Sequence, residues 1–174
     1  MSHSISISPK IKENESCFRE VFKDCADILF HTMELGRGKT VDCFVIYLEV
    51  AVSNMILEKS VLGKFINELC KVSGDEILER VEKNALGISD AVQLDTVEDV
   101  VAGVFAGDAV FFIDGYAHAV KISEKGYPSM GVSEADREKV LRGSKEGFTD
   151  SVKTNSALIR KRIRNPGMKV KEQT

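Results

Sequence analysis

The sequence lacks long hydrophobic runs, and this absence limits what the chain can be. The longest apolar stretch, Cys43 to Val52, contains Glu49 and is shorter than the roughly 18 residues that a membrane-spanning helix needs. The N-terminus has no basic segment followed by an apolar one, so we expect no signal peptide. The chain as given is therefore predicted to be soluble.

Metal-binding cysteine motifs are also missing. The four cysteines, at positions 17, 25, 43 and 70, include no C-x-x-C pair, and two of them lie in apolar periodic stretches. Structural zinc sites usually draw their ligands from closely spaced pairs, so we expect no metal site, and we expect no cofactor. Buried, reduced thiols in a reducing compartment are the simpler interpretation.

The composition is that of a folded domain with an uneven charge distribution. Hydrophobic residues make up 43% of the 174 residues and charged residues 29%, as in globular proteins. The net charge is −3, but residues 142–171 hold nine Lys/Arg against two acids, a net of +7, whereas residues 1–141 hold 15 against 24, a net of −9. A basic segment on an acidic body suggests that this segment meets something negative.

Hydrophobic periodicity predicts an α/β fold. The order of the elements favours a small mixed sheet of three to four strands, with right-handed βαβ crossovers and helices on both faces. Val41 to Leu48 is apolar at nearly every position, as expected in the middle of such a sheet, and Asp114-Gly115 favours a two-residue type I′ hairpin turn. We expect helices over 16–32, 53–72, 75–86, 97–105 and 145–164, and strands over 41–48, 90–94, 109–113 and 116–122.

The last of these elements is a C-terminal basic amphipathic helix. Its apolar residues share one stripe at helical spacing, and Asn155 falls inside it. We expect the stripe to anchor the helix to the body, with Asn155 either bonded to a backbone group or contacting a partner. The stripe consists of Phe148, Val152, Ile159 and Ile163.

These features divide the chain into four parts. Residues 1–13 are expected to be a flexible lead-in, and residues 14–141 an α/β lobe. Residues 142–164 form the basic helix, which packs on the lobe or leads out of it, and residues 165–174 form a linker.

The loop before the basic helix resembles a phosphate-binding loop only superficially. Gly143 and Gly147 flank Ser144 and Lys145, but no Lys-Ser/Thr follows the second glycine, as the P-loop spacing requires. A structural role is the favoured interpretation, in which the glycines shape a loop and Ser144 caps the helix. Contact with a ligand, another subunit or another lobe is the alternative, and its candidate residues are Arg142, Gly143, Ser144 and Lys145.

The basic run near the end of the helix allows several partners. Nucleic acid is disfavoured because the body is acidic and no aromatic residue interleaves the run. Anionic headgroups or an acidic partner surface remain candidates, with Arg160, Arg162 and Asn155 as contact residues. The alternative is a solvated helix whose basic groups pair with the acidic body.

No set of residues predicts catalysis. His31 and His118 have no nearby Ser or Cys nucleophile with an orienting partner, and His118 is expected to face solvent on a strand. The acidic residues around position 95 are best explained as helix caps and surface groups. We therefore expect no enzyme activity.

Three linked motifs carry a family resemblance. Phe112–Tyr116, Arg142–Phe148 and Thr154–Ile163 occur in this order. Together they resemble the soluble N-terminal region of the GerA family of spore-germination proteins, which includes the A subunits of nutrient germinant receptors and the paralogous stage V sporulation protein AF. Ser144 leans towards the stage V branch, since receptor A subunits more often carry proline there, whereas the larger size of the receptor branch favours an A subunit.

The resemblance implies a role in a germinant-gated ion channel complex. Such proteins assemble in the inner membrane of the dormant spore with B- and C-type subunits and with copies of themselves, and this domain would lie on the core side. The family pattern adds a second α/β lobe and a membrane region, so we expect this chain to be a fragment. A small-molecule-binding domain of the receptor is the alternative.

Overall fold

The computed structural model describes residues 4–49, 61–83, 91–123, 148, 150–163, 165 and 167–171. Within these residues one five-stranded sheet has the strand order β1-β2-β4-β5-β3, and every adjacent pair is antiparallel. The elements are α1 (Ile11–Val21), β1 (Ile28–Leu35), β2 (Val41–Leu48), α2 (Val61–Leu69), α3 (Gly74–Glu82), β3 (Ala91–Leu94), α4 (Val97–Ala106), β4 (Ala109–Ile113), β5 (Ala119–Ile122) and α5 (Val152–Ile163).

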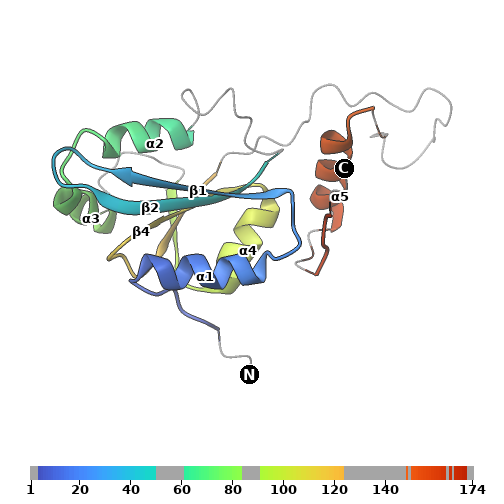
Figure 1. Cartoon of the computed structure of the whole chain (residues 1–174), viewed down its shortest axis with the longest axis horizontal. Helices are drawn as coiled ribbons and strands as arrows, with labels where there is room; N and C mark the ends of the chain where they lie inside the picture. Colours follow the sequence, from blue (N-terminus) through green and yellow to red (C-terminus); the bar gives the residue numbers. More distant parts are fainter. Residues whose placement is uncertain are drawn as a thin grey trace.

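Helices cover both faces of the sheet, which confirms the predicted α/β class. Helices α1 and α4 lie on one face and α2 and α3 on the other, while α5 stands at one end of the molecule beyond α4 (Figure 1). Alternate residues of β2 therefore enter two separate cores. Phe44 packs with α1 and α4, and Val45 packs with α2 and α3. This double burial explains why β2 is apolar on both faces.

The sheet differs from the prediction in strand number and direction. It has five strands where three to four were expected, and no parallel βαβ crossover occurs within the described part of the chain. The additional strand is β1, because residues 28–35 pair along their whole length with β2. The predicted helix over 16–32 is thus wrong in its second half. Helix α1 ends at Val21, and Asp24 turns the chain with a positive φ of 62°.

The expected hairpin between β4 and β5 is present, but its turn is longer than predicted. Strand β5 begins at Ala119 rather than Tyr116, and Phe111 pairs with Val120. Gly115 has the positive φ of 87° that a tight turn requires. However, Asp114 accepts a hydrogen bond from the Ile11 N–H through its Oδ1 atom, and Gly115 N donates to the Pro9 carbonyl. The turn therefore holds the start of α1 instead of closing a two-residue hairpin.

Side-chain hydroxyls accept hydrogen bonds at the starts of α3, α4 and α5. The Thr96 hydroxyl accepts a hydrogen bond from Asp99 N at 3.1 Å and starts α4, and Ser73 starts α3 in the same way. The described helix α5 begins at Val152, where the Ser151 hydroxyl accepts a hydrogen bond from Thr154 N. The predicted starts at Ser53 and Lys145 lie outside the described residues.

The start of the chain is part of the fold from Ile5 onward. Val97 N donates to the Ile5 carbonyl and Ile7 N to the Asp95 carbonyl, and the Ile7 side chain is buried. These contacts differ from the expected flexible lead-in over residues 1–13.

Among the helices that the structure describes, none has the length and apolar content to cross a bilayer.

The stacked pair Phe44 and Phe112 gives a test of the core. Their ring centroids lie 4.4 Å apart and both side chains are fully enclosed. We expect Phe44→Ala to lower the free energy of unfolding by about 3–5 kcal/mol, because it removes burial and leaves a cavity. Urea unfolding followed by circular dichroism measures this. Val92→Ala, on the exposed edge strand β3, serves as the control and should change stability by less than about 1 kcal/mol.

Candidate functional site

Helix α5 is attached to the body by a buried ion pair. Arg160 is fully enclosed, and its Nε and Nη2 atoms donate to the two carboxylate oxygens of Asp27 at 2.7 and 2.9 Å. Its Nη1 atom donates to the Met168 carbonyl at 2.8 Å. The guanidinium also lies over the Phe105 ring of α4, 4.9 Å from the centroid, which is a cation–π distance. We call these contacts the Arg160 anchor.

The residues after α5 add to this attachment. Ala26 N donates to the Val170 carbonyl at 2.9 Å, and the Cys25 thiol lies 3.8 Å from the Met168 carbonyl. Lys169 Nζ donates to the Val21 carbonyl. Residues 168–171 therefore lie along the α1–β1 connection. Hydrogen bonds hold both α5 and the segment after it to the body.

The guanidinium of Arg160 keeps its positive charge within the anchor. Burial alone would lower the pKa of Arg160, but the hydrogen bond and negative charge of Asp27 outweigh burial and raise the pKa above its ordinary value. A fork of parallel hydrogen bonds to one carboxylate is the geometry that arginine satisfies and lysine does not. The anchor is thus specific for this pair of side chains.

The predicted contact residues fall into different environments. Arg160 is enclosed by its own chain, so the expectation that it contacts an external partner is wrong in this structure. It pairs with Asp27 of the acidic body instead, as the alternative interpretation predicted. Lys153 likewise pairs with Glu49 at 2.5 Å. Arg162 is exposed and Asn155 is half-buried. Arg142, Gly143, Ser144 and Lys145 lie outside the described residues.

Three of the four residues of the predicted apolar stripe are exposed, two on α5 and Phe148 before it, while Ile159 is half-buried. Phe148, Val152 and Ile163 are 73, 76 and 53% exposed, while Leu158 is buried. The expectation that the stripe anchors the helix is therefore wrong. The physical reason is that pairing with Asp27 sets the rotation of α5 about its axis and turns the stripe outward. A hollow of about 370 Å³ lies along it, and we call it the α5 hollow. It is lined by Phe148, Leu158, Ile159, Arg162 and Ile163.

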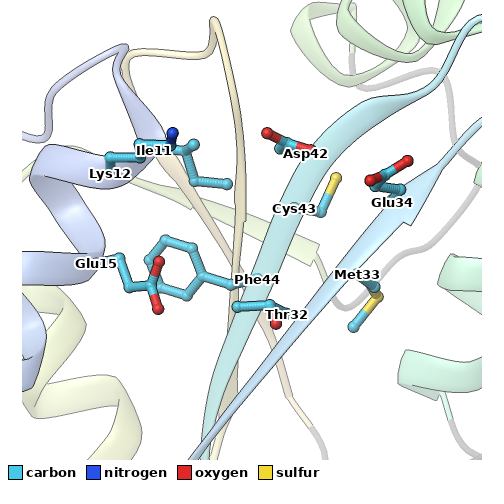
Figure 2. Close-up of a pocket in the computed structure, with 9 residues that line it drawn as sticks. All are labelled: Ile11, Lys12, Glu15, Thr32, Met33, Glu34, Asp42, Cys43 and Phe44. Carbon is cyan, nitrogen blue, oxygen red and sulfur yellow. The ribbon is translucent and has the colours of Figure 1, made fainter.

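A second hollow of about 380 Å³ lies between α1 and the β1–β2 pair (Figure 2). We call it the acidic hollow, because three of its side chains are carboxylates and one is a lysine. The Phe44 ring and the Asp42 carboxylate extend from β2 towards α1 in this view. Sequence reasoning missed this site, since β1 was assigned to a helix. The lining residues are Ile11, Lys12, Glu15, Thr32, Met33, Glu34, Asp42, Cys43 and Phe44.

Burial and nearby carboxylates suppress ionisation of the Cys43 thiol. Burial raises the pKa of Cys43 to about 12, and the negative charges of Asp42 and Asp114 contribute to the increase. A thiol that stays protonated at neutral pH is a poor nucleophile. Cys43 therefore has a packing role rather than a chemical one.

His118 pairs with a carboxylate that sequence reasoning treated as a simple surface group. Its Nδ1 atom lies 2.7 Å from Asp95 Oδ1. The pKa of Asp95 is lowered by hydrogen bonds from Gln93 and His118. His118 is partly exposed, but it lies just before β5 rather than on a strand as predicted. No cluster of three or more potential metal ligands occurs among the residues with described positions.

Comparison with solved structures shows which class of protein shares this fold. The structure is similar to the crystal structure of the N-terminal domain of the A subunit of the Bacillus megaterium spore germinant receptor GerK3. The TM-score is 0.64 at 20% identity, covering 94% of this chain and 58% of that one. At this level of identity the likeness concerns the fold.

Sequence comparison then identifies the family. Residues 16–174 match the family described as Bacillus/Clostridium GerA spore germination protein, and the chain belongs to that family. It is 32% identical over 166 residues to the uncharacterized membrane protein YfkQ of Bacillus subtilis (strain 168), covering 94% of this chain and 31% of that protein. It is 28% identical over 134 residues to stage V sporulation protein AF of the same organism. The second match covers 67% of this chain, and the two matches cover only 31% and 27% of the length of these relatives.

The Arg160 anchor gives a prediction about stability. Asp27→Ala leaves the guanidinium buried without its partner, so we expect it to lower the free energy of unfolding by about 3–5 kcal/mol. Asp27→Ala combined with Arg160→Met should cost less than Asp27→Ala alone, because no uncompensated charge remains. Chemical denaturation of the wild type, both single variants and the double variant measures this coupling. Lys153→Ala removes the Lys153–Glu49 ion pair and should lower the free energy of unfolding by less than about 1 kcal/mol. If Asp27→Ala lowered it by no more than Lys153→Ala does, the Arg160 anchor would be contradicted.

The cysteines give a prediction about reactivity. Cys70 is exposed, whereas Cys25 and Cys43 are buried, and Cys43 also resists ionisation. We expect iodoacetamide at pH 8 to alkylate Cys70 first in the folded protein and to spare Cys43 until the chain unfolds. Peptide mass spectrometry after timed quenching identifies the modified thiol. Early labelling of Cys43 in the folded protein would contradict its placement.

Proposed function

We propose that this chain is the soluble, non-catalytic signalling and assembly domain of a spore germination receptor subunit, within a germinant-gated ion channel complex. The observation that carries the proposal is the match of residues 16–174 to the GerA family. Several of the relatives are named spore germination proteins, and this is not a known enzyme family. The fold likeness to the N-terminal domain of a germinant receptor A subunit supports the same role.

The Arg160 anchor supports a mechanical part in signalling. It ties α5 and residues 168–171 to the α1–β1 connection through a bidentate ion pair and backbone hydrogen bonds. A displacement of the sheet therefore moves α5 with it, since buried polar networks rigidify the elements that they join. In the proposed receptor, residues 165–174 lead towards a second lobe and a membrane region, and α5 passes movement between them and the body.

The proposed surroundings follow from the same family. The full-length protein would lie in the spore inner membrane with this domain on the core side, beside B- and C-type subunits and further copies of itself. Residues 142–145, Asn155 and Arg162 are the proposed contact residues. An anionic membrane surface near α5 is a further proposed contact, because residues 142–171 carry an excess of cations.

A second candidate is a component of the stage V sporulation AF type. It is favoured by the 28% identity to that protein. A receptor subunit confers the response to particular nutrients, whereas a general component of the germination channel affects the response to all of them. The two candidates therefore differ in which responses are lost when the gene is removed. A small-molecule-binding domain of the receptor is a further candidate, for which the acidic hollow supplies a cleft of suitable volume.

Deletion of the full-length gene tests the proposal. We expect spores to lose or slow germination in response to one set of nutrients, measured as the fall in optical density and the release of cations. Full-length Asp27→Ala should reproduce the defect, because it releases α5 from the body, while Lys153→Ala should not. Immunoblots of the spore inner membrane verify that each variant is present. Normal germination with every nutrient after deletion would contradict the proposal, and slower germination with all nutrients would support the stage V type.

A further inference from the structure

The two edge strands of the sheet differ in how they are covered. At one edge, β3 has only four residues, and the N-terminal segment continues beyond it through the Ser6–Thr96 bridge and the hydrogen bond from Ile7 N to the Asp95 carbonyl. At the other edge, β1 pairs with β2 over all eight of its residues without a bulge. Among the described residues, no strand pairs with the outer side of β1.

The outer side of β1 is therefore an open hydrogen-bonding edge. In an antiparallel pair alternate residues direct their N–H and C=O groups away from the partner strand. Sheets usually protect such an edge with charged residues such as lysine, with proline, with a bulge or by keeping the strand short. The eight residues of β1, ILFHTMEL, include no lysine or proline, and Glu34 is their one carboxylate. A long, regular edge of this kind is a surface to which an extended segment of another protein can add as a further strand.

A pair of like charges lies beside this edge. Glu34 of β1 and Asp42 of β2 are directly opposite each other in the register, and both line the acidic hollow (Figure 2). Directly opposed like charges destabilise a strand pair. The Thr40 hydroxyl donates to Glu34 at 3.3 Å, but no cationic group among the described residues forms an ion pair with either carboxylate, although Lys12 lines the same hollow. A cation supplied from outside would offset this repulsion.

The opposite face of the β1 edge is mainly apolar. Leu29 and Met33 are half-buried and pack against the core beneath α2 and α3, with the exposed His31 between them. Successive side chains of a strand point to opposite faces of the sheet. A segment added to β1 therefore meets carboxylates on one face and apolar side chains on the other, so a fitting segment has alternating cationic and apolar residues.

We propose that β1 is a docking edge for an extended segment of a partner protein, which adds to the sheet as a further strand and places a lysine or arginine beside Glu34 and Asp42. Neighbouring strands lie about 4.8 Å apart, so a long cationic side chain of the added strand reaches Glu34 and extends towards Asp42. At the other end of the same face the Arg19 guanidinium already lies over the Phe30 ring, 4.7 Å from its centroid, which leaves the Glu34 end for the cation.

The partner segment differs from β1 itself. Because β1 contains no lysine or arginine, a second copy that paired through the same edge would bring no cation from its own β1 to the two carboxylates. A segment of a different protein, with cationic and apolar residues in alternation, supplies both the hydrogen bonds and the charge. This inference deepens the assembly role proposed above and rests on it.

An NMR titration of the isotope-labelled chain with short peptides tests the proposal. The probe is an acetylated, amidated heptapeptide in which lysine and valine alternate, and the matched probe carries glutamate in place of lysine. We expect the lysine peptide to bind with a Kd of about 1 mM or tighter and to shift the amide signals of β1, while those of β3 stay in place. The glutamate peptide should bind about tenfold more weakly, because it brings like charges together.

Reversal of the two carboxylates tests the charge contact. The double variant Glu34→Lys with Asp42→Lys should weaken binding of the lysine peptide by about tenfold or more and should bind the glutamate peptide instead. The double variant Glu82→Lys with Glu98→Lys makes the same change in net charge at exposed positions of α3 and α4, and it should bind both peptides as the wild type does. Circular dichroism verifies that each variant is folded.

A backbone-blocked probe separates strand addition from charge attraction alone. The lysine–valine peptide methylated at every amide nitrogen keeps its side chains but cannot donate backbone hydrogen bonds, so we expect it to lose binding. Four results would overturn the proposal: no saturable shift with several millimolar lysine peptide, shifts confined to residues outside β1, equal binding of the methylated or glutamate peptide, and unchanged binding of the lysine peptide by the reversed double variant. Broadening of the β1 signals by self-association without peptide would also overturn it, since a second copy would then occupy the edge. Because these measurements use the isolated chain, their failure leaves the germination test above unaffected.

Discussion

The ion pair between Arg160 and Asp27 is the interaction on which the placement of the C-terminal helix depends. A buried guanidinium requires a carboxylate and further acceptors, and it finds them in Asp27 and the Met168 carbonyl. Since these partners lie on the body and on the segment after α5, satisfying one side chain positions three parts of the chain. The outward direction of the apolar stripe is a consequence of this requirement.

The antiparallel sheet determines where the remaining surfaces lie. Strand β1 begins beside the anchor and ends beside the acidic hollow, so a single strand separates the two surfaces. The five-stranded sheet with helices on both faces is a rigid support between them. The proposed signalling role relies on such a support, because a flexible connection would absorb the movement to be transmitted.

Much of the fold could be predicted where local signals and tertiary contacts agree. Val41–Leu48 and Ala109–Ile113 are apolar on both faces and form central strands, and Thr96 starts a helix because its hydroxyl reaches the Asp99 N–H. Residues 28–32, the first part of β1, were assigned to a helix because Ile28 and Leu29 continue the helical spacing of α1. Only pairing with β2, which extends along the whole segment, makes them a strand. The acidic hollow depends on that pairing and was missed with it.

By itself the sequence determined the family, through motifs in fixed order, and the α/β class, through runs of apolar residues whose burial any fold of this chain must achieve. It also determined that a basic helix follows an acidic body. Only the tertiary structure decided which side of that helix faces the body. The apolar stripe suggested one answer, but Asp27, 133 residues before Arg160 in the chain, decided the other, because a buried charge without its partner costs more free energy than an exposed apolar stripe.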